Sequence, residues 1–163
     1  MHLRKDLHRK SRFRAGKIKA RILTVHHFQT SFQNKVWNHF HIDFLQQQGL
    51  PFQNVDTCPI TGFDLVRASW LTRIGFSVGY IDEREARGFL NIIGDLIQQQ
   101  FSSWEQLTAS YLIMYLEWNG AWKGALGVLR TPFVAKNHFQ GAKLLLEDNN
   151  SPFRTFEFTV CRT

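Results

Sequence analysis

The chain has few of the features that reveal a chemistry at first sight. It contains only two cysteines among 163 residues, and Cys58 and Cys161 form no spaced motif. So few cysteines argue against a disulfide framework, and we expect a reduced, cytoplasmic protein. No apolar run approaches the roughly 20 residues that a membrane-spanning helix needs. The basic start also lacks the apolar region of a signal peptide, so we expect no membrane partner.

Motifs for common ligands are missing as well. The sequence has no phosphate-binding glycine-rich loop, no dinucleotide fingerprint and no metalloprotease histidine pair. Seven histidines are present, but His26 and His27 are adjacent, and His39 and His41 lie two apart in helical surroundings. Structural zinc needs about four converging ligands. We therefore predict no metal site and no cofactor.

One short pattern matches a hydrolase motif. Residues 75–79 read Gly-Phe-Ser-Val-Gly, which is the spacing of a nucleophile elbow. That elbow requires a strand before the serine and a helix after it, whereas a helical pattern precedes Ser77. We interpret Ser77 as part of a linker and predict no catalytic residue, with an enzyme of unknown reaction as an alternative. Its candidate groups would be Asp64, Glu85, Glu105, Glu117 and His138, of which His138 is expected to be a partly buried ring with a hydrogen-bond partner.

Positive charge is concentrated at the N-terminus. Residues 1–21 carry a net charge of +8, and residues 22–163 carry −1. We predict a basic, flexible arm over residues 1–24 and a single domain over residues 25–163. The arm is either a solvated terminus or a weak, non-specific contact to nucleic acid through phosphates. The candidate contacts are Arg4, Lys5, Arg9, Lys10, Arg12, Arg14, Lys17, Lys19 and Arg21.

Apolar residues recur at helical spacing through the rest of the chain. Three helices are predicted between residues 62 and 120, with starts at Thr61, Asp82 and Ser103 and stops at Gly75 and at Asn119-Gly120. The first should bury the face that carries Phe63, Val66, Trp70 and Ile74, and the apolar linker over residues 76–81 should pack down. The second buries Ala86, Phe89, Leu90, Ile93, Leu96, Ile97 and Phe101. The third has an apolar stripe of Trp104, Leu107, Tyr111, Leu112, Tyr115 and Trp118.

Further helices are expected on both sides of this region. One helical pattern covers residues 28–48, residues 121–130 form a loose helix or turn, and Thr131-Pro132 should start a last helix. A Phe-rich tail follows the break at residues 148–152 and should lie extended on the helices. The sequence therefore predicts an all-α fold, a compact bundle of about five or six helices with the basic arm and this tail.

Several segments resemble a bacterial family of unknown function. They are residues 63–68, the Gly-Tyr-Ile-Asp-Glu-Arg-Glu-Ala stretch of residues 79–86, residues 101–105, Ser110-Tyr111-Leu112 with Trp118, and Leu144-Leu145-Leu146 with Ser151-Pro152-Phe153. The pattern is similar to that of the enterobacterial YbeU/YbeR-type proteins over about residues 40–158. The resemblance implies a fold but no activity.

The chain departs from that family at two positions. Arg87 stands where the family usually has Trp, and Met114 stands where it has a small Gly, so a different packing surface is expected there. Trp122 lies outside the apolar stripe and is the preferred exposed aromatic residue. We predict a partner groove that includes Arg87, Met114 and Trp122. The favoured function is a protein–protein interaction or scaffold module with an unknown protein partner, and the alternative is a nucleic-acid-associated protein that uses the arm.

Overall fold

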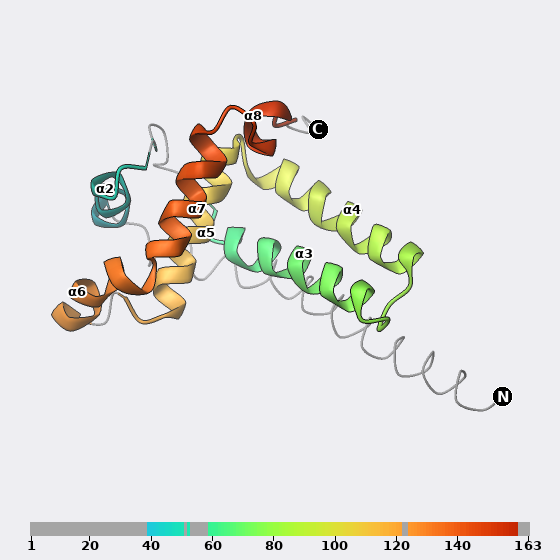
Figure 1. Cartoon of the computed structure of the whole chain (residues 1–163), viewed down its shortest axis with the longest axis horizontal. Coiled ribbons are helices and arrows are strands. Elements are labelled where there is room, and N and C mark those ends of the chain that lie inside the picture. Colours follow the sequence, from blue (N-terminus) through green and yellow to red (C-terminus); the bar gives the residue numbers. More distant parts are fainter. Residues whose placement is uncertain (1–38, 51, 53–58, 122–123, 160–163) are drawn as a thin grey trace.

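The fold is built from helices. The computed structural model describes residues 39–50, 52, 59–121 and 124–159, and no strand occurs within them. The all-α prediction is confirmed, whereas the basic arm and Trp122 lie outside the described residues. The helices are α2 (His39–Gln47), α3 (Gly62–Ser77), α4 (Glu83–Gln100), α5 (Trp104–Trp118), α6 (Gly124–Val134), α7 (Lys136–Glu147) and α8 (Pro152–Thr155) (Figure 1).

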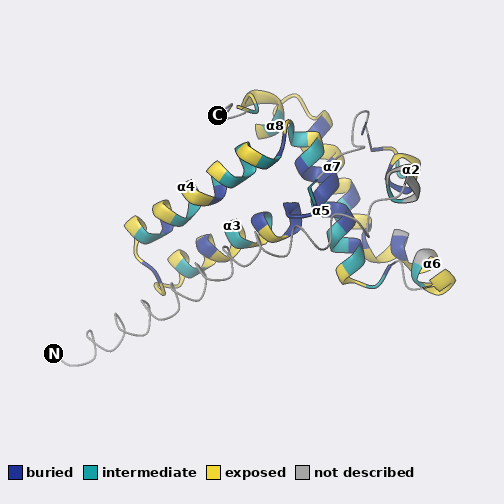
Figure 2. Cartoon of the chain, turned by 180° about the vertical axis from the view of Figure 1, so that it is seen from behind, coloured by how far each residue is buried: buried dark blue, intermediate teal, exposed yellow. Residues whose placement is uncertain are grey.

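Helix α5 is the centre of the domain. It packs against α2, α3 and α7, and its Leu112, Ile113 and Leu116 are fully buried. Helices α3 and α4 form a hairpin that extends to one side of α5 and α7, while α2 and α6 lie on the other side (Figure 1). Figure 2 shows that buried residues concentrate where α5, α7 and the start of α3 meet.

The starts of α4 and α5 are confirmed. The Asp82 carboxylate accepts the backbone N–H of Glu85 at 2.8 Å, and the Glu85 carboxylate accepts that of Asp82 at 3.0 Å, which completes a capping box. Ser103 accepts the N–H of Gln106 at 3.1 Å at the start of α5. Gly120, with φ of 71°, supplies the left-handed residue after α5.

The predicted start of α3 is confirmed, and its predicted end is wrong. Thr61 is the residue before the helix, as expected, but its side chain makes no capping bond, and its hydroxyl donates to the Gln100 amide oxygen. The helix continues through Gly75 to Ser77. The carbonyl of Gly75 accepts the N–H of Tyr80 at 2.8 Å, and Gly79, with φ of 72°, makes the reversal. The stop is therefore the next glycine along the chain.

The outer half of the hairpin is more exposed than its sequence predicts. Trp70 and Ile74 were expected to be buried, but both are exposed, as are Phe76 and Tyr80 in the linker. The cause is the topology, because among the described helices α4 alone covers this half of α3, whereas α5 covers its first turns. In the linker, Ile81 is the residue that packs down, against Gly75.

Thr131 and Pro132 do not start a helix. Both lie inside α6, and the break comes at Ala135, so α7 begins at Lys136. The Thr131 hydroxyl donates to the Gly127 carbonyl at 2.9 Å and is therefore used within its own helix. Gly127 permits a close approach, since a Cβ there would lie 2.7 Å from the carbonyl oxygens of Gly120 and Ala121.

The C-terminal tail lies on α5, as expected, but it begins with the short helix α8. Ser151 caps α8, and residues 156–159 follow without regular structure. None of the described helices combines the length and the apolarity required to cross a bilayer.

Candidate binding groove

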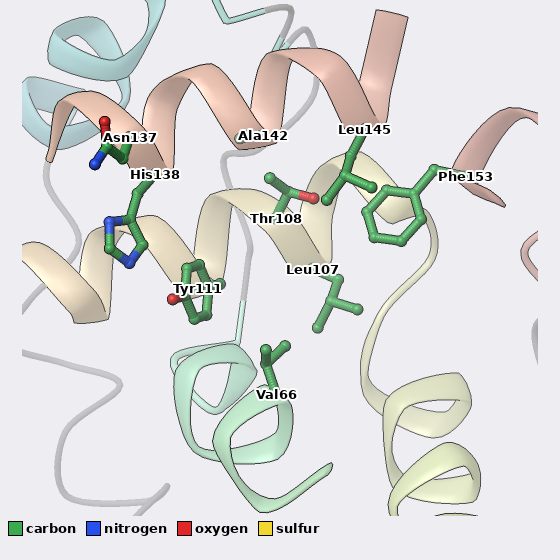
Figure 3. Close-up of a pocket in the computed structure, with 10 residues that line it drawn as sticks. Val66, Leu107, Thr108, Tyr111, Asn137, His138, Ala142, Leu145 and Phe153 are labelled. Carbon is green, nitrogen blue, oxygen red and sulfur yellow. The ribbon is translucent and has the colours of Figure 1, made fainter. Parts of the chain in front are cut away.

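A groove of about 440 Å³ lies between α3, α5 and α7. Helix α5 forms its floor, α3 and α7 form its walls, and Phe153 of α8 lies at one end (Figure 3). Its lining residues are Val66, Leu107, Thr108, Tyr111, Asn137, His138, Gly141, Ala142, Leu145 and Phe153.

The body of the groove is apolar. Val66 comes from α3, Leu107 from α5, and Ala142 and Leu145 from α7. The hydroxyl of Thr108 donates to the Trp104 carbonyl at 2.7 Å, so it offers no free donor to a ligand. Polar groups are confined to the end where Tyr111 lies, and the groove is therefore suited to an apolar body with one polar end.

Aromatic residues close the other end of the groove. The Phe153 ring stacks on Trp104 with a centroid distance of 4.3 Å and an interplanar angle of 9°. Phe158 meets the same indole edge-on at 4.9 Å. The indole N–H of Trp104 donates to the Phe156 carbonyl at 3.0 Å. The tail thus closes this end of the groove through three contacts with one side chain.

A second aromatic group lies at the end of the groove opposite Phe153, which Tyr111 and His138 line and which we call the open end. The buried Phe63 ring lies 5.6 Å from Tyr111, 6.2 Å from Tyr115 and 5.9 Å from Trp118. The imidazole of His138 stacks on Tyr115 at 3.8 Å. We call Phe63, Tyr111, Tyr115, Trp118 and His138 the aromatic rim. It joins the starts of α3 and α7 to the second half of α5.

Three titratable groups beside this rim have shifted pKa values. Burial raises the pKa of Asp64, although Arg67 opposes that shift. Burial, together with Tyr115, raises the pKa of the Tyr111 phenol, and Arg67 again opposes it. Burial lowers the pKa of His138. Such shifts gather at functional sites more often than elsewhere, so they add to the interest of the rim beside the groove.

His138 differs from its prediction in one respect. Its ring is half-buried, as expected, but the buried Nδ1 atom has no hydrogen-bond partner among the described residues. Its position against Tyr115 is therefore fixed by stacking, and a neutral imidazole is favoured there because an ionised ring would be less well solvated.

Arg67 is held above the rim. Its guanidinium carbon lies 5.2 Å from the centroid of Phe63 and 5.2 Å from that of Trp118, within the range of cation–π attraction. Arg67 is exposed and forms no ion pair with any described residue. The rim therefore carries a positioned guanidinium whose charge is directed toward solvent.

The described part of the chain brings no three metal-ligating side chains together. Ser77, the residue of the hydrolase-like pattern, ends α3, and its hydroxyl donates to the Ile74 carbonyl at 2.9 Å. The described residues before it form α3 and not a strand, so the context of a nucleophile elbow is absent there, whereas its predicted place in the linker is wrong because Ser77 is the last residue of α3. Neither feature supplies a nucleophile to the groove.

The structure places two of the three predicted partner-groove residues on different helices. Arg87 is exposed in the second turn of α4, where it pairs with Glu83 at 2.8 Å. That turn lies at the end of the hairpin farthest from α5, which carries Met114 (Figure 1). Trp122 and all nine cations of the arm lie outside the described residues, so the predictions made on them stay predictions.

Sequence reasoning missed most of the groove. It treated Tyr111, Tyr115 and Trp118 as a buried stripe, and their spacing on one helix face is the signal that places them together. Nothing in the sequence indicates that Asn137 and Gly141 of α7 face Val66 of α3, because that pairing depends on how α3 and α7 pack on α5.

Comparison with known proteins gives a family but no activity. No curated protein and no solved structure is significantly similar to the chain. The profile of one family matches residues 4–158, a longer region than the resemblance in the sequence suggests, and it includes most of the basic arm. The matched region is nearly the whole sequence. The chain therefore belongs to the family described as protein of unknown function DUF1266.

Proposed function

We propose that this helical domain is a protein-interaction module that binds apolar side chains of a protein partner in the groove between α3, α5 and α7. The observation that carries the proposal is an almost wholly apolar groove of about 440 Å³ on the surface of a small domain. Its volume falls within the range of about 300–1,000 Å³ that is typical of ligand pockets. A concave, mostly apolar surface with a few polar groups at one end is the usual form of a ligand-binding site. 

The shape of the groove favours a segment of a protein. Two helices form its walls and a third forms its floor, an arrangement that accepts apolar side chains from a helix or an extended segment. The half-buried Tyr111 lines the groove, and the exposed Trp118 belongs to the aromatic rim that continues from it. Aromatic side chains of these types are enriched at protein interfaces, where they often contribute most of the binding energy.

Photo-crosslinking in cells tests the proposal directly. A photoreactive amino acid replaces Leu145, which lines the groove, or its neighbour Leu144, which is 64% exposed but does not line it. We expect discrete protein adducts from position 145 and few from position 144. Equal adducts from both positions, or none from position 145, would refute a protein partner in the groove.

A filled groove provides the specificity control. A Cβ at Gly141 meets nothing within 4 Å, so Gly141→Leu should extend into the groove without a clash. Gly88→Leu is the matched control, since Gly88 lies on α4 away from the groove and its Cβ also meets open space. Both changes improve helix propensity. The adducts from position 145 should disappear with Gly141→Leu and persist with Gly88→Leu.

A further inference from the structure

The guanidinium of Arg67 lies over the aromatic rim, whose Tyr111 and His138 line the groove, without an ion-pair partner among the described residues. We infer that the partner segment presents a carboxylate beside its apolar side chains and that Arg67 binds this carboxylate. The inference rests on the proposed function, because the apolar side chains occupy the groove while the carboxylate meets Arg67. It specifies the chemistry of the partner, an apolar segment with an acidic group at one end.

Arg67 is prepared for such a contact. Its guanidinium carbon is 5.2 Å from the ring centroids of both Phe63 and Trp118, so the two rings restrict its position before any ligand arrives. Phe63 is buried and fixed by its contacts with Tyr111 and Tyr115. A guanidinium offers several N–H donors in a planar fork that matches a carboxylate. Because the side chain is already ordered, less entropy is lost on binding.

The position of Arg67 couples it to the groove. It follows Val66, which lines the wall formed by α3. Its positive charge also acts on the phenol of Tyr111, which lines the same groove from α5. When the apolar body of a ligand lies between Val66 and Leu145, the end of the ligand near Tyr111 therefore approaches the positive charge of Arg67. Tyr111 and Asn137 add neutral hydrogen-bonding groups at that end.

Asp64 is the charge that opposes this contact. It lies one turn before Arg67 on α3, and the two form no ion pair. An incoming carboxylate is attracted by Arg67 and repelled by the ionised Asp64. The inference therefore predicts opposite effects for the two residues: Arg67→Gln weakens the binding of an anionic ligand, and Asp64→Asn strengthens it.

Two related dyes test the inference on the full chain. Anilinonaphthalene sulfonate carries an anionic group on an apolar ring system, and phenylnaphthylamine has the same ring system without the charge. We expect both to fluoresce in the groove and the anionic dye to bind more tightly. Arg67→Gln should weaken the anionic dye about fivefold, the effect of a favourable exposed ion pair, and leave the neutral dye unchanged. Raising the salt concentration should weaken only the anionic dye.

Arg73→Gln is the matched control. Arg73 is exposed on the same helix and takes part in none of the ring contacts of Arg67. This change removes the same net charge and should alter neither dye. Unchanged binding of the neutral dye to Arg67→Gln also shows that the groove is still folded. Gly141→Leu should weaken both dyes, which confirms that they bind in the groove.

The outcomes separate the inference from the proposed function. If neither dye binds, or if Gly141→Leu changes the binding of neither dye, the proposal that the groove binds apolar groups is refuted. If both dyes bind but Arg67→Gln affects them equally or not at all, the groove stands and the role of Arg67 is refuted. Displacement of the neutral dye by three peptides then distinguishes a terminal carboxylate from a side-chain one. Acetyl-Leu-Leu-Phe as the free acid carries a terminal carboxylate, and its amide carries none. The same peptide extended by a glutamate amide carries only a side-chain carboxylate.

Discussion

The contact between the C-terminal tail and Trp104 leads to a quantitative prediction. Trp104→Ala removes the stacked contact with Phe153, the edge-on contact with Phe158 and the indole N–H bond to the Phe156 carbonyl. The indole is half-buried, so the tail residues provide much of its cover. The substitution should release residues 152–159 from α5 while the centre of α5 stays packed.

The magnitude follows from these contacts. Each aromatic pair contributes about 0.5–1.5 kcal/mol beyond its buried area, and the hydrogen bond contributes about 0.5–1.5 kcal/mol. We therefore expect the free energy of unfolding to fall by about 2–4 kcal/mol, somewhat less than for a fully buried Trp. Trp104→Phe keeps a ring against Phe153 and loses the N–H donor, so it should cost about 1 kcal/mol.

Urea unfolding followed by far-UV circular dichroism provides the assay. Since small domains are stable by only about 5–15 kcal/mol, a loss of this size shifts the midpoint clearly. Trp118→Ala is the control, because Trp118 is 65% exposed. Its contacts with the Phe63 ring and the Arg67 guanidinium should make the loss about 1–2 kcal/mol. Equal midpoints for Trp104→Ala and Trp118→Ala would show that the tail does not stabilise the domain through Trp104.

Three further predictions concern packing, pH and the arm. Gly62→Ala should destabilise the domain by about 2–4 kcal/mol, because its Cβ would lie 2.6 Å from the Ser110 hydroxyl and 2.9 Å from the Tyr111 backbone nitrogen. Gly94→Ala is the control in the same unfolding assay and should be neutral or stabilising, because a Cβ at Gly94 meets nothing within 4 Å. Burial holds the pKa of His138 below its ordinary value of 6.5. The contribution of the neutral ring to stability is therefore complete above pH 6.5 and is lost as pH falls from there toward the pKa of the folded state. His138→Gln should flatten the stability profile over this pH range. Deletion of residues 1–21 should leave the helical domain folded by circular dichroism and should abolish any weak binding to DNA or RNA. In the full chain this binding should disappear between low and physiological salt. Tight binding that survives about 0.2 M salt would make nucleic acid the partner.

The sequence predicts local structure well where a side chain acts on its own helix. The Asp82 capping box and the Ser103 cap need only residues three positions away, so they can be read directly. Gly75 shows where such reading fails. A glycine near the end of an apolar stripe suggests a stop, but the reversal occurs at Gly79, because Gly75 accepts the hydrogen bonds of the returning chain.

Burial and the candidate site depend on contacts that periodicity does not describe. Trp70 and Ile74 repeat at helical spacing, yet both are exposed, because among the described helices α5 crosses α3 only near its start. For the same reason, Arg67 lies against the aromatic rim and Arg73 does not, although both are arginines on one helix. Their difference depends on Phe63 at the start of the same helix and on Trp118 of α5, which is about 50 positions further along the sequence.

The hairpin of α3 and α4 has a consequence for the dynamics of the domain. Among the described elements, α4 packs mainly on α3, while α3 is anchored to α5 where the Ser110 hydroxyl accepts the N–H of Gly62 at 2.9 Å and donates to the Pro59 carbonyl. Local opening of the distal hairpin therefore disturbs few contacts in the rest of the core. Its amide protons should exchange with solvent through openings that cost less free energy than global unfolding, while those of α5 exchange only when the whole domain unfolds.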